Sequence, residues 1–189
     1  MIFLLFFFSL TTCEAQVDNG FEEAMIVTKK GDSIKGFVKV APSYGVKIGY
    51  KKAMNDEETS ISTKEIKFIR TPNRYLENVR LGKRESLMTL VVDGKARLFL
   101  QVVSQVVVPQ SRTSHYEARA TPYETHIPLF VVKMGETYTE VKKKRYQEIL
   151  SALLFACPEV VEMLRKHAFT YEKMSDAVMY YNSCKSSFE

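Results

Sequence analysis

The residues that could carry out chemistry are few in this chain and stand far apart. Its three histidines are His115, His126 and His167, and it contains neither an HExxH nor a CxxC motif, so no spacing gathers metal ligands. A Gly-x-Ser-x-Gly elbow, a phosphate-binding glycine-rich loop and a Gly-x-Gly-x-x-Gly fingerprint are also missing. We therefore expect no cofactor and no metal, and the sequence favours a protein that is not an enzyme.

Adjacent acidic residues occur at Glu22-Glu23 and at Glu57-Glu58. Neighbours in a strand point to opposite faces of the sheet, and neighbours in a helix lie about 100° apart around its axis. This geometry favours solvated surface carboxylates over a pair that works as general acid and base on one substrate.

Cysteine chemistry centres on Cys157 and Cys184. A thiolate at Cys157 with His167 as its base would need the two side chains to meet, but ten residues of one helix span about 15 Å. A helix over 158–167 followed by an antiparallel helix over 171–183 would instead bring Cys184 back beside Cys157. The sequence therefore predicts a disulfide between them, in a compartment that permits oxidation.

The polar stretch from Pro109 to Thr125 is predicted to be a loop. It offers hydrogen-bond donors and aromatic planes, and its candidate binding residues are Arg112, His115, Tyr116, Arg119 and Tyr123. Long ordered loops often carry function, which favours a ligand-binding interpretation. A mobile loop that faces solvent is the alternative, and the sequence leaves both open.

A short basic run, Lys142-Lys143-Lys144-Arg145, stands at the start of a predicted amphipathic helix. Positive charge at this end opposes the helix dipole, so helix propensity does not account for the run. Two interpretations remain, a solvated face at a strand-to-helix junction and a binding site for anionic lipid or glycan.

The amino terminus has the features of an export signal. Residues 2–10 are apolar with one exception, and this run is about half of the roughly 20 residues that cross a bilayer as a helix. Small and polar residues follow, and Ala15 before Gln16 is a suitable cleavage position, which predicts residues 1–15 as a signal peptide. The segment that ends at Cys13 also loosely resembles a lipobox, so a lipid anchor on that cysteine is the alternative.

The composition is that of a globular protein. Of 189 residues, 46% are hydrophobic and 26% charged, which excludes disordered, collagen-like and polytopic membrane proteins. Loss of Glu14 with the signal would leave 27 basic and 21 acidic residues, a formal charge of +6. Outside the cytoplasm this balance indicates solubility or contact with anionic envelope surfaces, and we expect neither nucleic-acid binding nor a transmembrane helix in the mature chain.

From about residue 22 to 141 short β-type runs alternate with turn signals. The strongest hairpin joins Leu87–Val92 to Ala96–Val103 through Asp93-Gly94, a dipeptide that favours a type I′ turn. Both strands of this hairpin are apolar on both faces, so we expect them in the middle of a sheet. The other predicted strands cover 24–30, 33–40, 46–51, 66–70, 75–81, 127–134 and 137–141.

After Lys142 the apolar period changes from two to about 3.6, which predicts three helices over about 146–154, 158–167 and 171–183. The predicted fold class is α+β, in which an antiparallel β-rich N-terminal portion, a meander or partly closed sheet, is covered by about three C-terminal helices. Residues 16–189 are expected to form a single domain, β-rich over 22–141 and helical over 142–184.

Several short motifs carry a resemblance. A signal that ends in Ala15-Gln16, the octapeptide GDSIKGFV at 31–38, Cys157-Pro158-Glu159 and the tail motif YNSC at 181–184 occur in this order. In these features the chain resembles a group of uncharacterised secreted and envelope proteins of Bacteroidota. The resemblance implies an envelope or extracellular setting and implies no activity.

These observations predict a non-enzymatic extracytoplasmic protein, periplasmic or secreted, that binds or assembles with another envelope component, whether a protein, a glycan or a lipid surface. The alternatives are an envelope-acting hydrolase whose acids come from separate strands and a surface lipoprotein anchored at Cys13. A deep pocket with two convergent carboxylates would favour the hydrolase, and a shallow surface with an exposed apolar patch would favour the binding protein.

Overall fold

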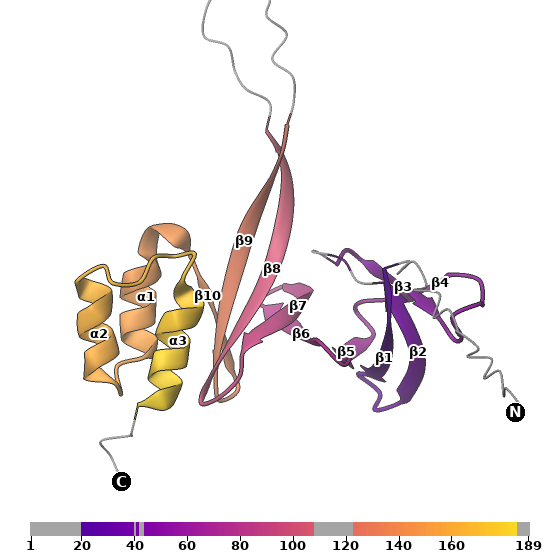
Figure 1. Ribbon diagram of the computed structural model, residues 1–189, viewed down its shortest axis with the longest axis horizontal. Helices are drawn as coiled ribbons and strands as arrows, with labels where there is room; N and C mark the ends of the chain where they lie inside the picture. Colours follow the sequence, from indigo (N-terminus) through magenta and orange to yellow (C-terminus); the bar gives the residue numbers. More distant parts are fainter. Residues whose placement is uncertain (1–19, 40, 42–43, 108–122, 185–189) are drawn as a thin grey trace, which may run out of the picture.

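A computed structural model of the protein describes residues 20–39, 41, 44–107 and 123–184. In this part of the chain ten strands form one open antiparallel sheet, and three α-helices follow it (Figure 1). The strand order is β10-β9-β8-β7-β6-β5-β1-β2-β3-β4. Strands consecutive in sequence are therefore neighbours in the sheet, except that β5 pairs with β1 and not with β4. The predicted α+β class with C-terminal helices is confirmed. The strands are β1 (Phe21–Thr28), β2 (Ser33–Lys39), β3 (Lys47–Lys51), β4 (Thr59–Ser62), β5 (Ile66–Arg70), β6 (Tyr75–Leu81), β7 (Arg84–Val92), β8 (Ala96–Val107), β9 (Tyr123–Met134) and β10 (Thr137–Val141).

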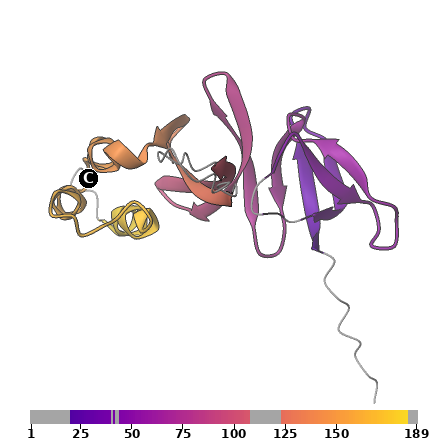
Figure 2. The ribbon, with the colours of Figure 1, turned by 90° about the horizontal axis from the view of Figure 1, so that it is seen from above.

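The N-terminal strands form the predicted meander, with one strand more than the sequence indicated. Gly31, with φ at 95°, makes the tight turn between β1 and β2 that a side chain with a Cβ would strain. Strand β4 was not predicted, because its segment TSIS is short and largely polar. These strands curl around a buried cluster that includes Ile26, Ile48 and Ile69 (Figure 2).

The central strands are buried on both faces at Leu87–Met88 and Leu98–Phe99, as their apolar sequences indicated, whereas Val91 and Val103 of the same predicted strands are exposed. On one face Phe99 packs with Met88 and Val131, and Phe99 is completely buried. On the other face Leu98 and its neighbours pack against the helices. The middle of the sheet therefore has a core on each side, which explains why these strands lack a polar face.

The turn between β7 and β8 differs from the predicted two-residue type I′ turn. Such a turn needs positive φ at both central residues, but Asp93 is not among the residues with positive φ, and the register shifts between Leu90 and Val92. The physical reason is tertiary. The Asn182 side chain donates to Asp93 O at 3.2 Å and to Ala96 O at 2.9 Å, and accepts from Ala96 N at 2.8 Å.

The helices α1 (Tyr146–Leu153), α2 (Pro158–Arg165) and α3 (Met174–Ser183) pack at the β8–β10 end of the sheet (Figures 1 and 2). Helix α1 is preceded by a 3-10 turn, Lys143–Arg145. Helix α3 starts at Met174 and not near Tyr171 as predicted, because Tyr171 instead buries its ring against Phe130 and donates from its hydroxyl to Pro128 O at 3.1 Å.

Strands β8 and β9 continue well past their neighbours and project from the sheet (Figure 1). Pairing with β7 stops at Leu100 and pairing with β10 stops at Phe130, so residues 101–107 and 123–129 pair only with each other. We call this two-stranded ribbon the arm. The predicted loop from Pro109 to Thr125 is wrong at its end, because Tyr123 already pairs with Val107 in β9.

Candidate functional site

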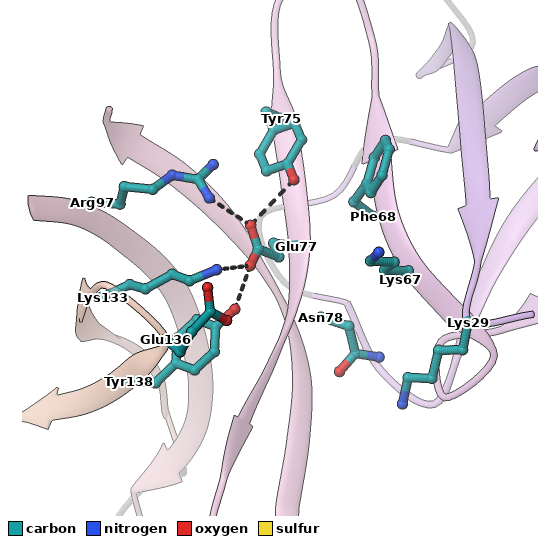
Figure 3. Close-up of a pocket in the computed structure, with 10 residues that line it drawn as sticks. All are labelled: Lys29, Lys67, Phe68, Tyr75, Glu77, Asn78, Arg97, Lys133, Glu136 and Tyr138. Carbon is teal, nitrogen blue, oxygen red and sulfur yellow. Dashed lines mark hydrogen bonds and ion pairs between the residues drawn. The ribbon is translucent and has the colours of Figure 1, made fainter. Parts of the chain in front are cut away.

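A cavity of about 440 Å³ opens beside β6, where that strand faces β8, β9 and β10. At its centre lies the carboxylate of Glu77, which points between side chains from these three strands (Figure 3). Only 11% of the Glu77 side chain is exposed. The cavity is lined by Lys29, Lys67, Phe68, Tyr75, Glu77, Asn78, Arg97, Lys133, Glu136 and Tyr138.

Sheet register places the partners of Glu77. Arg97 of β8 pairs with Lys133 of β9, which pairs in turn with Tyr138 of β10. Residues that are paired across strands point to the same face, so these three side chains form a row. The sheet curls until β6 faces β10, and this curl brings Glu77 to the row.

Four donors converge on the Glu77 carboxylate (Figure 3). Arg97 Nη1 and the Tyr75 hydroxyl donate to Oε2 at 2.9 and 3.2 Å. Lys133 Nζ donates to Oε1 at 2.8 Å, and the Tyr138 hydroxyl also donates to Oε1. Every acceptor of this buried carboxylate is thus engaged, as buried charges require.

The electrostatics of the cavity keep Glu77 ionised. Burial raises the pKa of Glu77, but the hydrogen bonds from Lys133 and Tyr138 and the charges of Lys133 and Arg97 outweigh burial, so its pKa is lowered. Burial also raises the pKa of the Tyr138 hydroxyl, and the neighbouring Glu77 raises it further. A carboxylate with a lowered pKa and a phenol with a raised pKa are a poor general acid and a poor general base near neutral pH. The cluster joins β6 to β8, β9 and β10.

The arm presents apolar side chains to solvent. Val103 and Ile127 lie opposite each other on one face and are 41% and 45% exposed. Val107 and Tyr123 lie opposite each other four positions further along the same face. At the base of the arm this face continues into the buried cluster around Phe99 through Leu129. Val106 is exposed on the opposite face.

Of the predicted binding residues, Tyr123 is described and lies at the start of β9, where it is 55% exposed. Arg112, His115, Tyr116 and Arg119 lie outside the described residues. The structure therefore places one member of that set on the arm and does not test the others. His126 also lies on the arm, with its Nδ1 3.1 Å from the Ser104 hydroxyl.

The predicted basic run and three of the four predicted acidic residues are exposed, whereas Glu22 is partly buried. Glu58 pairs with Lys39 at 3.4 Å, and Glu22 accepts from the Thr71 hydroxyl at 2.8 Å. In the basic run, which is exposed throughout, Lys143 pairs with Glu172 at 2.7 Å and Arg145 with Glu148 at 2.6 Å. The run occupies a strand-to-helix junction, and two of its four charges are paired.

The predicted pairing of Cys157 with Cys184 is present, with Cα atoms 6.2 Å apart. The Glu159 carboxylate lies 3.3 Å from Cys157 Sγ. Among the described residues, Cys157, Glu159 and Cys184 form a group whose side chains are close enough together to hold a metal ion. Because the sulfurs are joined to each other, they are not available as thiolate ligands. His167 Nδ1 lies 2.7 Å from Gln147 Nε2, and Cys157 in the disulfide offers no thiol from which a base could take a proton.

Within the described residues, none of the helices has the length and apolar character needed to cross a bilayer. Comparison with known proteins gives no match to a family model, to a curated protein or to a solved structure.

Sequence reasoning missed Glu77 and the arm. Glu77 stands in the ordinary strand sequence YLENVRL, and nothing local marks it as buried. The one available signal is that Tyr75 and Val79, which share the face of Glu77 in the strand, are largely apolar, and a charge on such a face is buried only when paired. The arm is hidden because its sequence resembles that of any strand, and only pairing shows that it leaves the sheet.

Proposed function

We propose that this protein is a non-enzymatic extracytoplasmic protein that binds another component of the cell envelope through its arm. The observation that carries the proposal is the exposed apolar face of the arm, formed by Val103, Ile127 and Tyr123. A two-stranded ribbon is only marginally stable in water by itself. An exposed apolar patch on such an element is typical of an interaction site.

The backbone of the arm supports the same proposal. Beyond Leu100 and before Phe130 both strands have an outer edge that no other described strand covers. Such edges offer unpaired N–H and C=O groups to an extended segment of a partner, and side chains on alternate positions then add specificity. We expect the partner to be a protein that supplies a strand with an apolar face.

The chemistry of the cavity favours a binding protein over the alternative hydrolase. A hydrolase of that kind would use two convergent carboxylates, one of them able to give up a proton. Glu77 is held ionised by four donors, and the other carboxylate of the cavity, Glu136, is exposed at the β9–β10 turn.

Site-specific photo-crosslinking in the native host tests the proposal. A photoreactive amino acid at position 127 should give one discrete adduct in the envelope fraction, and adding Val103→Glu should abolish it. The matched control is the same probe at position 46, where Val46 is 67% exposed and far from the arm in sequence. Absence of an adduct at 127, or equal adducts at both positions, would contradict the proposal.

A further inference from the structure

Positive charge collects at the end of the sheet where β1 stops and β5 starts. Thr28 at the end of β1 pairs with Ile66 at the start of β5, and Lys29 N donates to Glu65 O at 2.8 Å. This pairing brings Lys29, Lys30 and Lys64 to the walls of one cavity of about 350 Å³.

The turn between β6 and β7 reaches the same end of the sheet. Lys29 Nζ pairs with Glu85 Oε2 at 2.6 Å, which ties the β1–β2 turn to the start of β7. Arg80 lies directly opposite Glu85. The hydrogen bond from Lys29, with the charges of Lys29, Arg80 and Lys64, lowers the pKa of Glu85. Cations at the β1–β2 turn, the β4–β5 turn and the β6–β7 hairpin therefore act on the same carboxylate.

We call this surface the basic end. Its six cations, less its three carboxylates, leave three positive charges there, whereas the whole chain carries +5. All six cations are exposed, and within the described residues five of them form no ion pair, since Lys29 alone pairs with a carboxylate. The cations are Lys29, Lys30, Lys64, Lys67, Arg80 and Lys83, and the carboxylates are Asp32, Glu65 and Glu85.

Excess charge of one sign over a concave surface concentrates counter-ions of the opposite sign. The cavity at Lys30 and Lys64 adjoins the Glu77 cavity at Lys29, which lines both. In Figure 3 Lys29 and Lys67 occupy the wall opposite Arg97 and Lys133. Cations at separate points along adjoining hollows match a chain with repeated negative charges better than a single small anion.

We propose that the basic end binds an acidic polysaccharide that carries carboxylate or sulfate groups along its chain. A membrane surface is less well matched, because interfacial binding buries a whole apolar face as well as using charge. Of the described large apolar side chains that are exposed, we place only Val46 beside the basic end, where its carbonyl accepts from Thr63 N at 2.9 Å. The choice of a glycan over nucleic acid rests on the extracytoplasmic location proposed above. The proposal that the basic end binds a polyanion depends only on the positions of its cations.

Binding of a fluorescent heparin dodecasaccharide to the purified protein tests this inference, with fluorescence anisotropy as the measurement. The affinity should fall steeply between about 50 and 200 mM salt, because binding releases counter-ions. The variant Lys30→Ser/Lys64→Ser/Arg80→Ser should bind at least about tenfold more weakly and show a shallower salt dependence. A second variant, Lys67→Ser/Lys83→Ser, removes no side-chain hydrogen bond and should also weaken binding.

The matched control is Lys142→Ser/Lys144→Ser/Lys173→Ser, which removes the same charge from the helical end and should change the affinity less than about twofold. An equal loss in this control would show that net charge alone drives binding and would overturn the site. Unchanged binding by both basic-end variants would also overturn it. Tighter binding to duplex DNA or to phosphatidylserine vesicles than to the glycan would replace the proposed ligand. None of these variants alters a residue of the arm, so a negative result would refute glycan binding by the basic end without bearing on the proposal that the arm binds a partner protein.

Discussion

At the scale of single residues, Glu77 holds the curled half of the sheet together. Its carboxylate pairs with both Arg97 and Lys133, and Arg97 also pairs with the exposed Asp93 at 2.9 Å. Removal of the Glu77 charge would therefore leave Lys133 without its carboxylate partner in a half-buried site, close to Arg97. Removing one partner of a buried ion pair lowers the free energy of unfolding by more than the intact pair contributes to it, because the remaining charge stays desolvated. The residue therefore matters for stability although its segment has no motif.

We expect Glu77→Gln to lower the free energy of unfolding by roughly 2–4 kcal/mol, measured by denaturant unfolding at neutral pH. Glu136→Gln is the matched control, because Glu136 lines the same cavity but is exposed. That control should cost less than about 0.5 kcal/mol. Equal small effects in both variants would show that the four hydrogen bonds contribute little.

The lowered pKa of Glu77 also predicts a pH dependence. A carboxyl whose pKa is lower in the folded state stabilises the fold above its ordinary pKa of 4.5, and this contribution is lost as the pH falls through the folded pKa. Unfolding measured from about pH 6 to about pH 3 should therefore show a larger loss of stability in the wild type than in Glu77→Gln. Parallel pH profiles would contradict this assignment, because every other carboxyl is common to both proteins.

Asn182 is the second residue with a role that its position in the sequence does not suggest. Its amide makes three hydrogen bonds to the backbone of the β7–β8 turn, and a Cβ added at Gly94 would lie 2.5 Å from its Nδ2. We expect Asn182→Ala to destabilise the protein by about 1–3 kcal/mol in denaturant unfolding, because buried backbone groups lose their partners. The exposed amide Asn55 gives the control, and an Asn55→Ala effect of the same size would refute the role.

At the scale of elements, the β7–β8 hairpin is the centre of the sheet. Phe99 is completely buried, and Leu90, which the sequence also suggested for the core, is half-buried. Phe99→Ala should create a cavity and cost roughly 3–5 kcal/mol. Val91→Ala in the adjoining strand, where Val91 is 44% exposed, should cost far less. Thermal or denaturant unfolding decides this, and a loss at Phe99 below about 0.5 kcal/mol would mean that the strand is not central.

At the scale of the whole molecule, the Cys157–Cys184 disulfide joins the start of α2 to the end of α3. Closing this loop stabilises the fold by up to about 3.6 kcal/mol in the chain-entropy model. Peptide mapping without reductant should recover the two cysteines in one cross-linked peptide. Two free, alkylatable thiols in protein from the native host would contradict the bridge and the oxidising compartment with it.

We also expect the protein to be exported with loss of residues 1–15. Intact-mass analysis of protein from its native host should show a chain that starts at Gln16, because the apolar run before Ala15 has the length of a signal-peptide core. A diacylglyceryl adduct on Cys13 would replace this with the lipoprotein alternative. A full-length cytoplasmic chain would refute export.

Much of the fold follows from local chemistry that the sequence contains by itself. Alternation of apolar and polar residues located most strands, the change of period after Lys142 located the helices, and helix lengths paired Cys157 with Cys184. These features are predictable because periodicity and turn chemistry act over a few neighbouring residues. The turn at Asp93 was predicted wrongly because its conformation depends on hydrogen bonds from Asn182, which is distant in the chain and invisible to local turn chemistry.

The candidate sites were decided by tertiary structure alone. The arm exists because β7 and β10 stop pairing at Leu100 and Phe130, a property of neighbouring strands and not of the arm's own residues. Likewise, the basic run at 142–145 is the obvious cluster in the sequence, yet half of its charges are paired. The basic end instead assembles cations from separate turns, and among the described residues Lys29 alone of them pairs with a carboxylate. Charge and burial depend on distance in space, and antiparallel pairing makes residues neighbours that the chain keeps far apart.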